Sequence, residues 1–391
     1  MSDPVVASLL DTDSYKFSMQ QAIHQHYPDV EVVFSFICRS PVDLTHLAGA
    51  VREQVTALGD LRLTADERRW LGEVGILRPD YLDWLERLRL DPSRVQVRVS
   101  GGQLCIDVRG IWAEVTLFEI YILTIVNELY ARQRPVEKTL AQARVRLTDK
   151  LNWLEAEGLK TPPLSVVDFG TRRRLSGAWQ QELLQTFHAR LPEVLQGTSN
   201  VMLARTLALP VRGTMGHEWI QAHQGLTQEL GSSQRRALQL WLEEYPHQPG
   251  VALTDTIGMT AFLRDFDVSL AGRYKGMRHD SGDPLTWGER ALRHYEELGV
   301  AVQDKTLMFS DNLDFGKAVQ IHRHFAGRIA TSFGIGTWLT NDAGGAPLNA
   351  VVKLLFCNGR PVAKISDEPG KTLSPDPKHL ARVRKAYSCV S

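Results

Sequence analysis

From residue 136 onward, short apolar segments alternate with helical patterns, and no other feature of the chain constrains its fold as much. Alternating strands and helices predict a parallel sheet, and eight such units over about 220 residues predict a β/α barrel. A doubly wound open sheet is the alternative. The eight segments that read as strands are "LSVVDFGTR", "VLQGTSN", "LALPVRGT", "GVALTDT", "YKGMRHDSGD", "TLMFSDN", "RIATSFGIGT" and "AVVKL".

The first third of the chain mixes helices with short strands. Residues 13–26, 65–90 and 114–132 read as helices, the second of them in one or two pieces. The segment "EVVFSFICR" reads as a strand, and "RVQVRVSGGQLCIDVRG" reads as two strands joined by a hairpin turn.

A length of 391 residues is too great for one ordinary core and predicts two domains. We expect an N-terminal α/β domain over residues 1–134 and a β/α barrel over residues 135–391. The C-terminal tail can pack back on the first domain.

The composition excludes two classes of partner. Lys+Arg and Asp+Glu both total 45, so the formal net charge is zero and no overall positive field attracts nucleic acid. The chain has no apolar run of roughly 18 residues, which predicts no membrane span. The N-terminus lacks the basic and apolar regions of a signal peptide. We therefore expect a cytoplasmic protein without nucleic-acid or membrane partners.

The cysteines are dispersed and show no metal-binding spacing. They are Cys38, Cys105, Cys357 and Cys389. The first three have apolar neighbours in sequence, so we expect buried, reduced thiols at these positions.

Polar residues and glycines gather where the predicted strands end. Enzymes with a β/α barrel place their sites at these carboxyl ends. Glycine, hydroxyl, Asp and Arg in seven such loops favour a phosphorylated, polyhydroxylated ligand, and the absence of GxxxxGK[ST] argues against a P-loop ATPase. The strand-end residues are Asp168, Arg172, Thr198, Ser199, Arg212, Thr214, His217, Asp255, Thr256, Arg278, Asp280, Ser281, Ser310, Asp311, Gly334, Gly336 and Thr337.

The segment "RGTMGHEWIQAH" carries two histidines but does not have the spacing of a zinc site. A zinc-protease helix needs His-Glu-x-x-His, and here Gln221 stands where the second histidine belongs. His217 falls at the start of a predicted helix, where the helix dipole lowers the pKa of an imidazole. A neutral imidazole beside a phosphate can act as a nucleophile, but a solvated helical histidine stays equally open from the residues alone. His223 reads as structural.

Ten segments in collinear order resemble nicotinate phosphoribosyltransferases, from about residue 9 to residue 372. This resemblance implies an α/β domain with an irregular β/α barrel. It also implies that nicotinate and phosphoribosyl pyrophosphate form nicotinate mononucleotide and pyrophosphate, coupled to ATP hydrolysis with Mg²⁺ and a phosphohistidine at His217, in NAD salvage. The segments are "LLDTDSYKFSMQQAIHQHYPD", "FSFICR", "DFGTRRR", "GTSN", "RGTMGHEWIQAH", "TDTIGMTAFL", "GMRHDSGDP", "FSDNLD", "SFGIGTWLTND" and "VVKL…AKISDEPGKT".

The resemblance also implies roles for individual residues. Tyr15 and Phe169 stack on the pyridine ring of nicotinate, and Arg172 pairs with its carboxylate. Asp255 and Asp280 hold ribose hydroxyls and Mg²⁺.

Further positions are expected to bind the phosphates. Lys364 and Lys371 meet pyrophosphate or ATP. Family members are typically homodimers with sites at the subunit interface, so that Tyr15 and Arg39 reach the neighbouring subunit's site. The residues expected to cradle the phosphoribosyl group are Arg278, Ser310, Asp311, Gly334 and Gly336. The remaining expected substrate-binding residues are Thr198, Ser199, Arg212, Thr214 and Thr337.

Nicotinamide is the closest alternative substrate. Ser199 stands where we expect an Asp in a nicotinamide-using relative, and a carboxylate there would repel nicotinate. Quinolinate use is conceivable from the arginines of "TRRR", although the His217 motif argues against it. A phosphosugar isomerase or aldolase would want a lysine at a strand end, and only Lys353 offers one.

Overall fold

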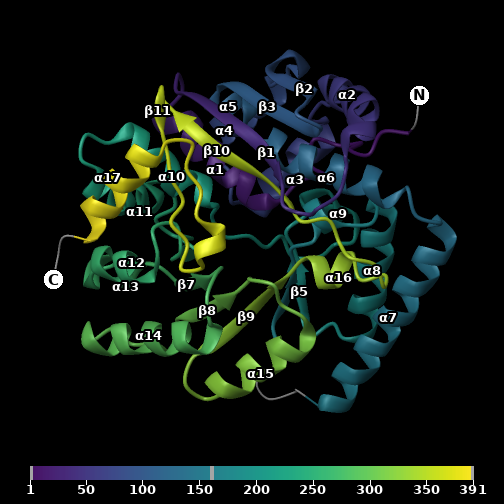
Figure 1. The fold of residues 1–391 in the computed structure, drawn as a ribbon. Coiled ribbons are helices and arrows are strands. Elements are labelled where there is room, and N and C mark those ends of the chain that lie inside the picture. Colours follow the sequence, from purple (N-terminus) through teal and green to yellow (C-terminus); the bar gives the residue numbers. More distant parts are fainter. Residues whose placement is uncertain (1–2, 159–162, 389–391) are drawn as a thin grey trace. The chain divides into compact units, whose positions relative to one another are not determined.

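The structure, a computed structural model, describes residues 3–158 and 163–388. The chain forms two compact units (Figure 1). The predicted boundary between residues 134 and 135 stays a prediction. Unit 1 comprises Met1–Asp29, Val33–Gly213 and Ile335–Lys353, and unit 2 comprises Val30–Val32, Thr214–Gly334 and Leu354–Ser391.

Helices and strands alternate along most of the chain. In the first half they are α1 (Ser14–His26), β1 (Glu31–Cys38), α2 (Ala48–Ala57), α3 (Ala65–Val74), α4 (Pro79–Arg87), β2 (Val95–Ser100), β3 (Gln103–Ile111), α5 (Trp112–Val115), α6 (Phe118–Ala131), α7 (Val136–Glu157), β4 (Val166–Asp168), the 3₁₀ turn η4 (Thr171–Arg173), α8 (Gly177–Arg190), β5 (Leu195–Thr198) and α9 (Val201–Thr206). In the second half they are α10 (His217–Leu226), α11 (Ser233–Glu244), β6 (Val251–Leu253), α12 (Met259–Asp265), α13 (Val268–Arg273), β7 (Gly276–His279), α14 (Pro284–Glu297), β8 (Thr306–Phe309), α15 (Phe315–Phe325), β9 (Ala330–Ile335), α16 (Thr337–Thr340), β10 (Ala350–Cys357), β11 (Arg360–Pro361) and α17 (Pro377–Ser388).

The predicted hairpin is confirmed. β2 and β3 pair antiparallel from Val95 opposite Val108 to Ser100 opposite Gln103. The two glycines between them have φ angles of 56° and 71°, a left-handed conformation that suits a tight hairpin turn.

Six of the eight predicted barrel strands lie in parallel pairs. β4 pairs with β5, and β6, β7, β8 and β9 pair in sequence order. The approach of β7 to β8 requires glycine at its first position, because a Cβ on Gly276 would lie 1.8 Å from the carbonyl oxygen of Thr306. These parallel strands and their helices confirm the α/β fold class.

Two predicted strands differ from the prediction. In "LALPVRGT" only an isolated bridge between Val211 and Thr198 forms, since Pro210 has no N–H to donate to a ladder. "AVVKL" belongs to β10, which pairs antiparallel with β11 rather than joining the parallel strands.

The expectation of buried cysteines holds only in part. Cys357 is buried, whereas Cys38 and Cys105 are half-buried. Cys105 alternates in β3 with the buried Leu104 and Ile106, so it faces the opposite side of the strand pair. Cys389 lies outside the described residues.

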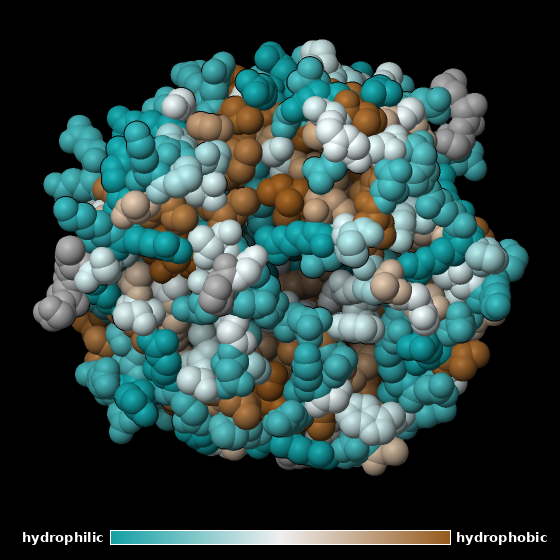
Figure 2. Space-filling model, viewed as in Figure 1, coloured by the Kyte–Doolittle hydropathy of each residue, from teal (hydrophilic) through white to brown (hydrophobic). Residues whose placement is uncertain are grey.

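Within residues 3–158 and 163–388, no helix is long and apolar enough to cross a membrane. On the face shown in Figure 2, hydrophilic and hydrophobic residues are interspersed. The large apolar side chains with substantial exposure are Val42, Val99, Val136, Val145, Trp153 and Val268.

A buried ion pair anchors the N-terminal segment inside unit 1. The guanidinium of Arg174 donates to both carboxylate oxygens of Asp11 at 2.7 Å, and both side chains are almost fully buried. We expect Arg174→Met to lower the free energy of unfolding by about 3–5 kcal/mol, because the Asp11 charge would remain buried without its counter-ion. Urea unfolding monitored by fluorescence measures this loss.

The matched control is Arg144→Met. Arg144 makes the same two-bond contact with Glu182, but both side chains are exposed. We expect this control to lose no more than about 1 kcal/mol. Equal losses in the two variants would contradict the prediction.

Candidate active site

His217 lies at the centre of a buried cluster in unit 2. It is the first residue of α10, and its Nε2 atom is 2.8 Å from Asp255 Oδ1 and 3.6 Å from Asp280 Oδ2. Asp255 follows β6 and Asp280 follows β7, so two neighbouring parallel strands deliver the carboxylates. The predicted strand-end position is correct for the two aspartates, and the predicted helix start is correct for His217.

The second oxygen of Asp255 is also bound. Its Oδ2 accepts a hydrogen bond from Ser281 Oγ at 2.8 Å and lies 2.9 Å from Lys364 Nζ. Asp255 therefore contacts an imidazole, a hydroxyl and an ammonium group, and its side chain is 1 % exposed. This network holds the carboxylate in one orientation.

The cluster keeps the His217 imidazole neutral. Burial, reinforced by the Lys364 ammonium, lowers the pKa of His217 to about 4. Although burial opposes it, the interactions with His217 and Lys364 hold the pKa of Asp255 well below its usual range. Since the Asp255 carboxylate can only accept, Nε2 carries the proton and Nδ1 carries the lone pair. From the sequence, the helix dipole alone was expected to lower the pKa of His217. In the structure, burial is the largest cause of the lowered pKa.

Arg278 ties the segments around this cluster together. Its Nε donates to Ser310 Oγ at 2.8 Å, one NH₂ group donates to Thr214 Oγ1 at 2.6 Å, and the other donates to Asp280 Oδ1 at 3.1 Å. Ser310 also donates to Asp280 Oδ1 at 2.7 Å. The predicted phosphate-binding residues Arg278, Ser310 and Thr214 thus form one network with Asp280.

Lys371 lies in a second charged group of unit 2. Its ammonium is 2.7 Å from Asp311 Oδ1 and 2.8 Å from Glu368 Oε2. In the same segment the carboxylate of Asp367 accepts from the backbone N–H of Met259 and so caps the start of α12. The expected phosphate-binding lysine is therefore paired with carboxylates in this structure.

Unit 1 brings Tyr15 and Arg172 together. A guanidinium NH₂ of Arg172 donates to Tyr15 Oη at 3.4 Å, and the guanidinium carbon lies 5.9 Å from the centre of the Tyr15 ring. Arg172 also lies 3.6 Å from Asp13 and 3.6 Å from Glu119. An aromatic ring beside a cation suits a flat aromatic carboxylate.

Tyr15 contacts Arg172 of its own chain, and the expectation that it reaches a neighbouring subunit's site stays a prediction. The start of α1 explains this position. The backbone N–H of Ser14 donates to the carbonyl of Ser199 at 2.7 Å, and Asp13 forms a bridge with Asn200. These bonds hold the beginning of α1 against the end of β5.

The hydroxyls at the end of β5 donate to carboxylates. Ser199 Oγ donates to Asp13 Oδ1 at 2.7 Å, and Thr198 Oγ1 donates to Asp168 Oδ2 at 2.7 Å. Burial, partly offset by hydrogen bonds from Thr198 and Gln180, raises the pKa of Asp168 to about 6. Thr198 is fully buried. Ser199 contacts Asp13, which in turn lies 3.6 Å from Arg172.

The other predicted residues lie at strand ends or in loops. Phe169 is half-buried directly after β4, and its N–H donates to Ile335 at 2.9 Å. A Cβ on Gly336 would lie 2.9 Å from the Phe169 carbonyl oxygen, so only glycine fits there without a shift. Gly334 is buried in β9, Thr337 begins α16, and Arg39 and Arg212 are exposed.

Comparison with known proteins identifies the family. The nicotinate phosphoribosyltransferase (NAPRTase) family model matches residues 164–390, and the NAPRTase N-terminal domain model matches residues 10–127. The chain belongs to the nicotinate phosphoribosyltransferase family.

Individual relatives support the assignment along the whole chain. Nicotinate phosphoribosyltransferase of Escherichia coli O127:H6 (strain E2348/69 / EPEC) is 50 % identical over 389 residues, covering 99 % of this chain and 97 % of that protein. The enzyme of Cronobacter sakazakii (strain ATCC BAA-894) is 48 % identical, with the same coverage. The crystal structure of nicotinate phosphoribosyltransferase from Vibrio cholerae is similar, with a TM-score of 0.94 and 38 % identity, and the match covers 100 % of this chain and 96 % of that one.

Sequence reasoning missed several residues of this family member's two clusters. Asp13 was not among the expected site residues, yet its side chain contacts Ser199 and Arg172. Glu119 went unnoticed inside the apolar segment "TLFEIYILTIV". A charged residue within such a segment is the signal that could have found it, because buried charges are usually paired.

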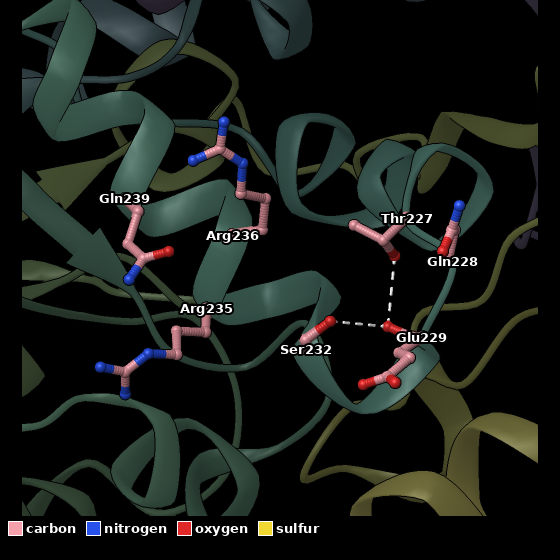
Figure 3. A pocket seen from close by; sticks show the side chains of 7 residues that line it. All are labelled: Thr227, Gln228, Glu229, Ser232, Arg235, Arg236 and Gln239. Carbon is pink, nitrogen blue, oxygen red and sulfur yellow. Dashed lines mark hydrogen bonds between the residues drawn. The ribbon is translucent and has the colours of Figure 1, made fainter.

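Figure 3 shows a surface hollow beside α11 whose lining residues belong to neither of these clusters. Its two guanidiniums already pair with carboxylates, Arg235 with Asp267 and Arg236 with Glu243 at 3.2 Å. We assign no ligand to it. Its lining residues are Thr227, Gln228, Glu229, Ser232, Arg235, Arg236 and Gln239.

Proposed function

We propose that this protein forms nicotinate mononucleotide and pyrophosphate from nicotinate and phosphoribosyl pyrophosphate, coupled to ATP hydrolysis, in NAD salvage. The observation that carries the coupling is the 2.8 Å hydrogen bond between His217 and Asp255 at the start of α10. Relatives that match 99 % of the chain are named for the transferase activity. A neutral imidazole with one nitrogen oriented by a carboxylate is an activated nucleophile.

Phosphoryl transfer from ATP would occur at Nδ1 of His217. The Nε2–H group of His217 donates a hydrogen bond to Asp255, so the free lone pair of the ring is on Nδ1. This lone pair attacks the γ-phosphorus of ATP. A nitrogen–phosphorus bond forms, the bond to the bridging oxygen breaks, and its electron pair leaves with ADP. The Nε2 proton stays between the ring and Asp255, whose negative charge offsets the positive charge that the ring gains.

The low pKa of His217 predicts a flat pH profile for its phosphorylation. With a pKa of about 4, the imidazole is neutral at pH 6 and at pH 8, so this group should change the rate by less than about twofold. An ordinary histidine with a pKa near 6.5 would lose roughly three quarters of its neutral form at pH 6. Rapid-quench labelling with γ-labelled ATP measures the profile, and an acid limb centred near pH 6.5 would contradict it.

The residues present fit the Mg²⁺ that the family resemblance implies. Asp255 and Asp280 supply hard oxygen ligands. Although burial opposes it, the interactions with Arg278 and His217 lower the pKa of Asp280 to about 2, so this carboxylate is ionised. Mg²⁺ usually takes one or two carboxylates together with substrate phosphates. When bound, it would neutralise charge on the departing pyrophosphate.

The ribosyl transfer itself needs positioning and charge stabilisation rather than a base. The ring nitrogen of nicotinate already holds a lone pair that can attack the anomeric carbon. Asp280 and the network of Arg278 and Ser310 would bind the phosphoribosyl group. Lys364 and Lys371 would exchange their present carboxylate partners for phosphate oxygens.

The nicotinate ring would bind in unit 1, where Tyr15 and Phe169 supply aromatic surface. Arg172 would pair with the substrate carboxylate, and it now contacts Tyr15 at 3.4 Å and Asp13 and Glu119 at 3.6 Å. The homodimer and the cytoplasmic location stay predictions. Analytical ultracentrifugation tests the oligomeric state.

Pyrophosphate release tests the proposed function. The protein is incubated with phosphoribosyl pyrophosphate, Mg²⁺ and either nicotinate or nicotinamide, with and without ATP. We expect nicotinate-dependent release that ATP stimulates and that EDTA abolishes. Faster turnover of nicotinamide would overturn the substrate assignment, and an absence of ATP stimulation would overturn the coupling.

A further inference from the structure

Glu119 divides its two carboxylate oxygens between two cations in unit 1. Its Oε2 lies 2.6 Å from the ammonium of Lys16, and its Oε1 lies 3.6 Å from a guanidinium NH₂ group of Arg172. Lys16 is fully buried and also donates to Thr116 Oγ1 at 3.2 Å. Three segments therefore meet at this carboxylate, namely α1, the start of α6 and the turn η4.

Stability alone does not account for such a pair. Taking an ammonium and a carboxylate out of water costs several kcal/mol per ion, and well-packed apolar residues often stabilise a core at least as well. The pair instead directs one carboxylate oxygen at the residue expected to bind the substrate carboxylate. Lys16 fixes Glu119, and Glu119 in turn faces Arg172.

Arg172 differs in this respect from Arg174, two residues along the chain. Arg174 makes two 2.7 Å bonds to Asp11 and is fully buried, which is the geometry of a structural arginine. The contacts of Arg172 with Asp13 and Glu119 are both 3.6 Å, and its side chain is 27 % exposed. The carboxylates of Asp13 and Glu119 lie on two sides of its guanidinium, at longer distances than the two bonds between Arg174 and Asp11.

We propose that Lys16 and Glu119 form a positioning pair that orients Arg172 toward the carboxylate of an aromatic monocarboxylate substrate. This inference rests on the proposed function for the identity of the substrate. Neither residue touches the substrate in this scheme. Both act through Arg172.

The charge states of the groups facing Glu119 support this arrangement. Although burial opposes it, the positive charges of Lys16 and Arg172 lower the pKa of Glu119, with a smaller effect of Lys353. The carboxylate is therefore ionised at neutral pH. An ionised Glu119 attracts the guanidinium of Arg172.

The decisive experiment uses a double variant, Lys16→Met/Glu119→Gln. It removes one positive and one negative charge, so the net charge near Arg172 is unchanged and a change in binding reports the orientation of Arg172. The probes are benzoate and benzamide, which lack the ring nitrogen and cannot be ribosylated. Calorimetric titration gives a Kd for each probe.

We expect the double variant to bind benzoate about tenfold more weakly than the wild type and benzamide within about twofold. Only benzoate needs the guanidinium to be oriented toward a carboxylate. If the double variant folds poorly, Glu119→Asp replaces it: this variant keeps the charge but withdraws the carboxylate, and it should weaken the binding of benzoate more than that of benzamide. The control is Glu182→Gln, in an exposed ion pair with Arg144, and it should change neither affinity.

Three outcomes bear on the inference and on the proposed function separately. Unchanged benzoate binding in the double variant and in Glu119→Asp would overturn the inference, and so would an equal loss of benzoate and benzamide binding. If the wild type binds benzoate and Arg172→Gln abolishes that binding, the substrate assignment stands whatever the positioning pair does. Failure of the wild type to bind benzoate would count against the proposed function itself.

Discussion

Substitution of His217 by asparagine is expected to abolish labelling of the protein by γ-labelled ATP and to remove the stimulation of pyrophosphate release by ATP. Asparagine fits the space but has no lone-pair nitrogen to attack phosphorus. We expect the labelling rate to fall more than about 1000-fold, since no other group replaces a covalent nucleophile. Acid-labile label retained on the filter after a short incubation measures this loss.

A matched histidine variant serves as the control. His188 is exposed in the last turn of α8, and His188→Asn should keep full labelling. The prediction also separates His217 from His223, whose Nδ1 contacts the Trp219 carbonyl at 2.7 Å and whose side chain is fully buried. Label that survives in His217→Asn and maps to His223 would contradict the assignment.

Substitution of Ser199 by aspartate is expected to turn the preference away from nicotinate. The hydroxyl of Ser199 donates to Asp13 Oδ1 at 2.7 Å, and Asp13 in turn lies 3.6 Å from Arg172. A new carboxylate there would repel the carboxylate of nicotinate by about 3 kcal/mol at ~5 Å and an effective dielectric constant of ~20. We therefore expect kcat/KM for nicotinate to fall about 100-fold.

Nicotinamide carries no charge and escapes this repulsion, so the ratio of the two kcat/KM values is the decisive measurement. Ser199→Ala removes the hydrogen bond without adding charge. It should weaken the two substrates by similar factors, about tenfold or less. An aspartate variant that keeps the wild-type ratio would show that position 199 does not discriminate by charge.

Much of the cluster formed by His217, Asp255 and Asp280 could be predicted from the local sequence pattern. Apolar segments that end in polar residues placed Asp255 and Asp280 at the ends of neighbouring strands, and the structure confirms both positions. A glycine-bearing segment followed by a helical pattern placed His217 at the start of α10. These predictions hold because strand and helix ends depend on a few adjacent residues.

The failures of prediction have equally local causes. Pro210 interrupts what reads as a strand, and one missing N–H is enough to reduce it to a bridge. The segment "AVVKL" reads as a strand and is one, but its antiparallel partner is the very short β11, which has almost no pattern of its own. Strand pairing depends on the partner, and a segment read alone does not contain it.

Carboxylates near the predicted nicotinate-binding residues escaped prediction for a related reason. Asp13, Glu119 and Arg172 lie far apart in sequence, yet a carboxylate oxygen of each acid lies 3.6 Å from the guanidinium of Arg172. The pattern around Glu119 indicates only a buried helix. The role of the Glu119 charge is apparent only in the tertiary structure, where Lys16 and Arg172 contact the carboxylate.

The sequence by itself determined the α/β class, the position of His217 at a helix start and the collinear motifs of the family. Those properties depend on residues close together in the chain. Only the tertiary structure decided that Asp255 accepts a hydrogen bond from Nε2 of His217, that burial and Lys364 keep the imidazole neutral, and that Ser199 donates to Asp13. Protonation and orientation depend on the nearest charged atoms in space, and here those atoms come from segments that folding alone brings together.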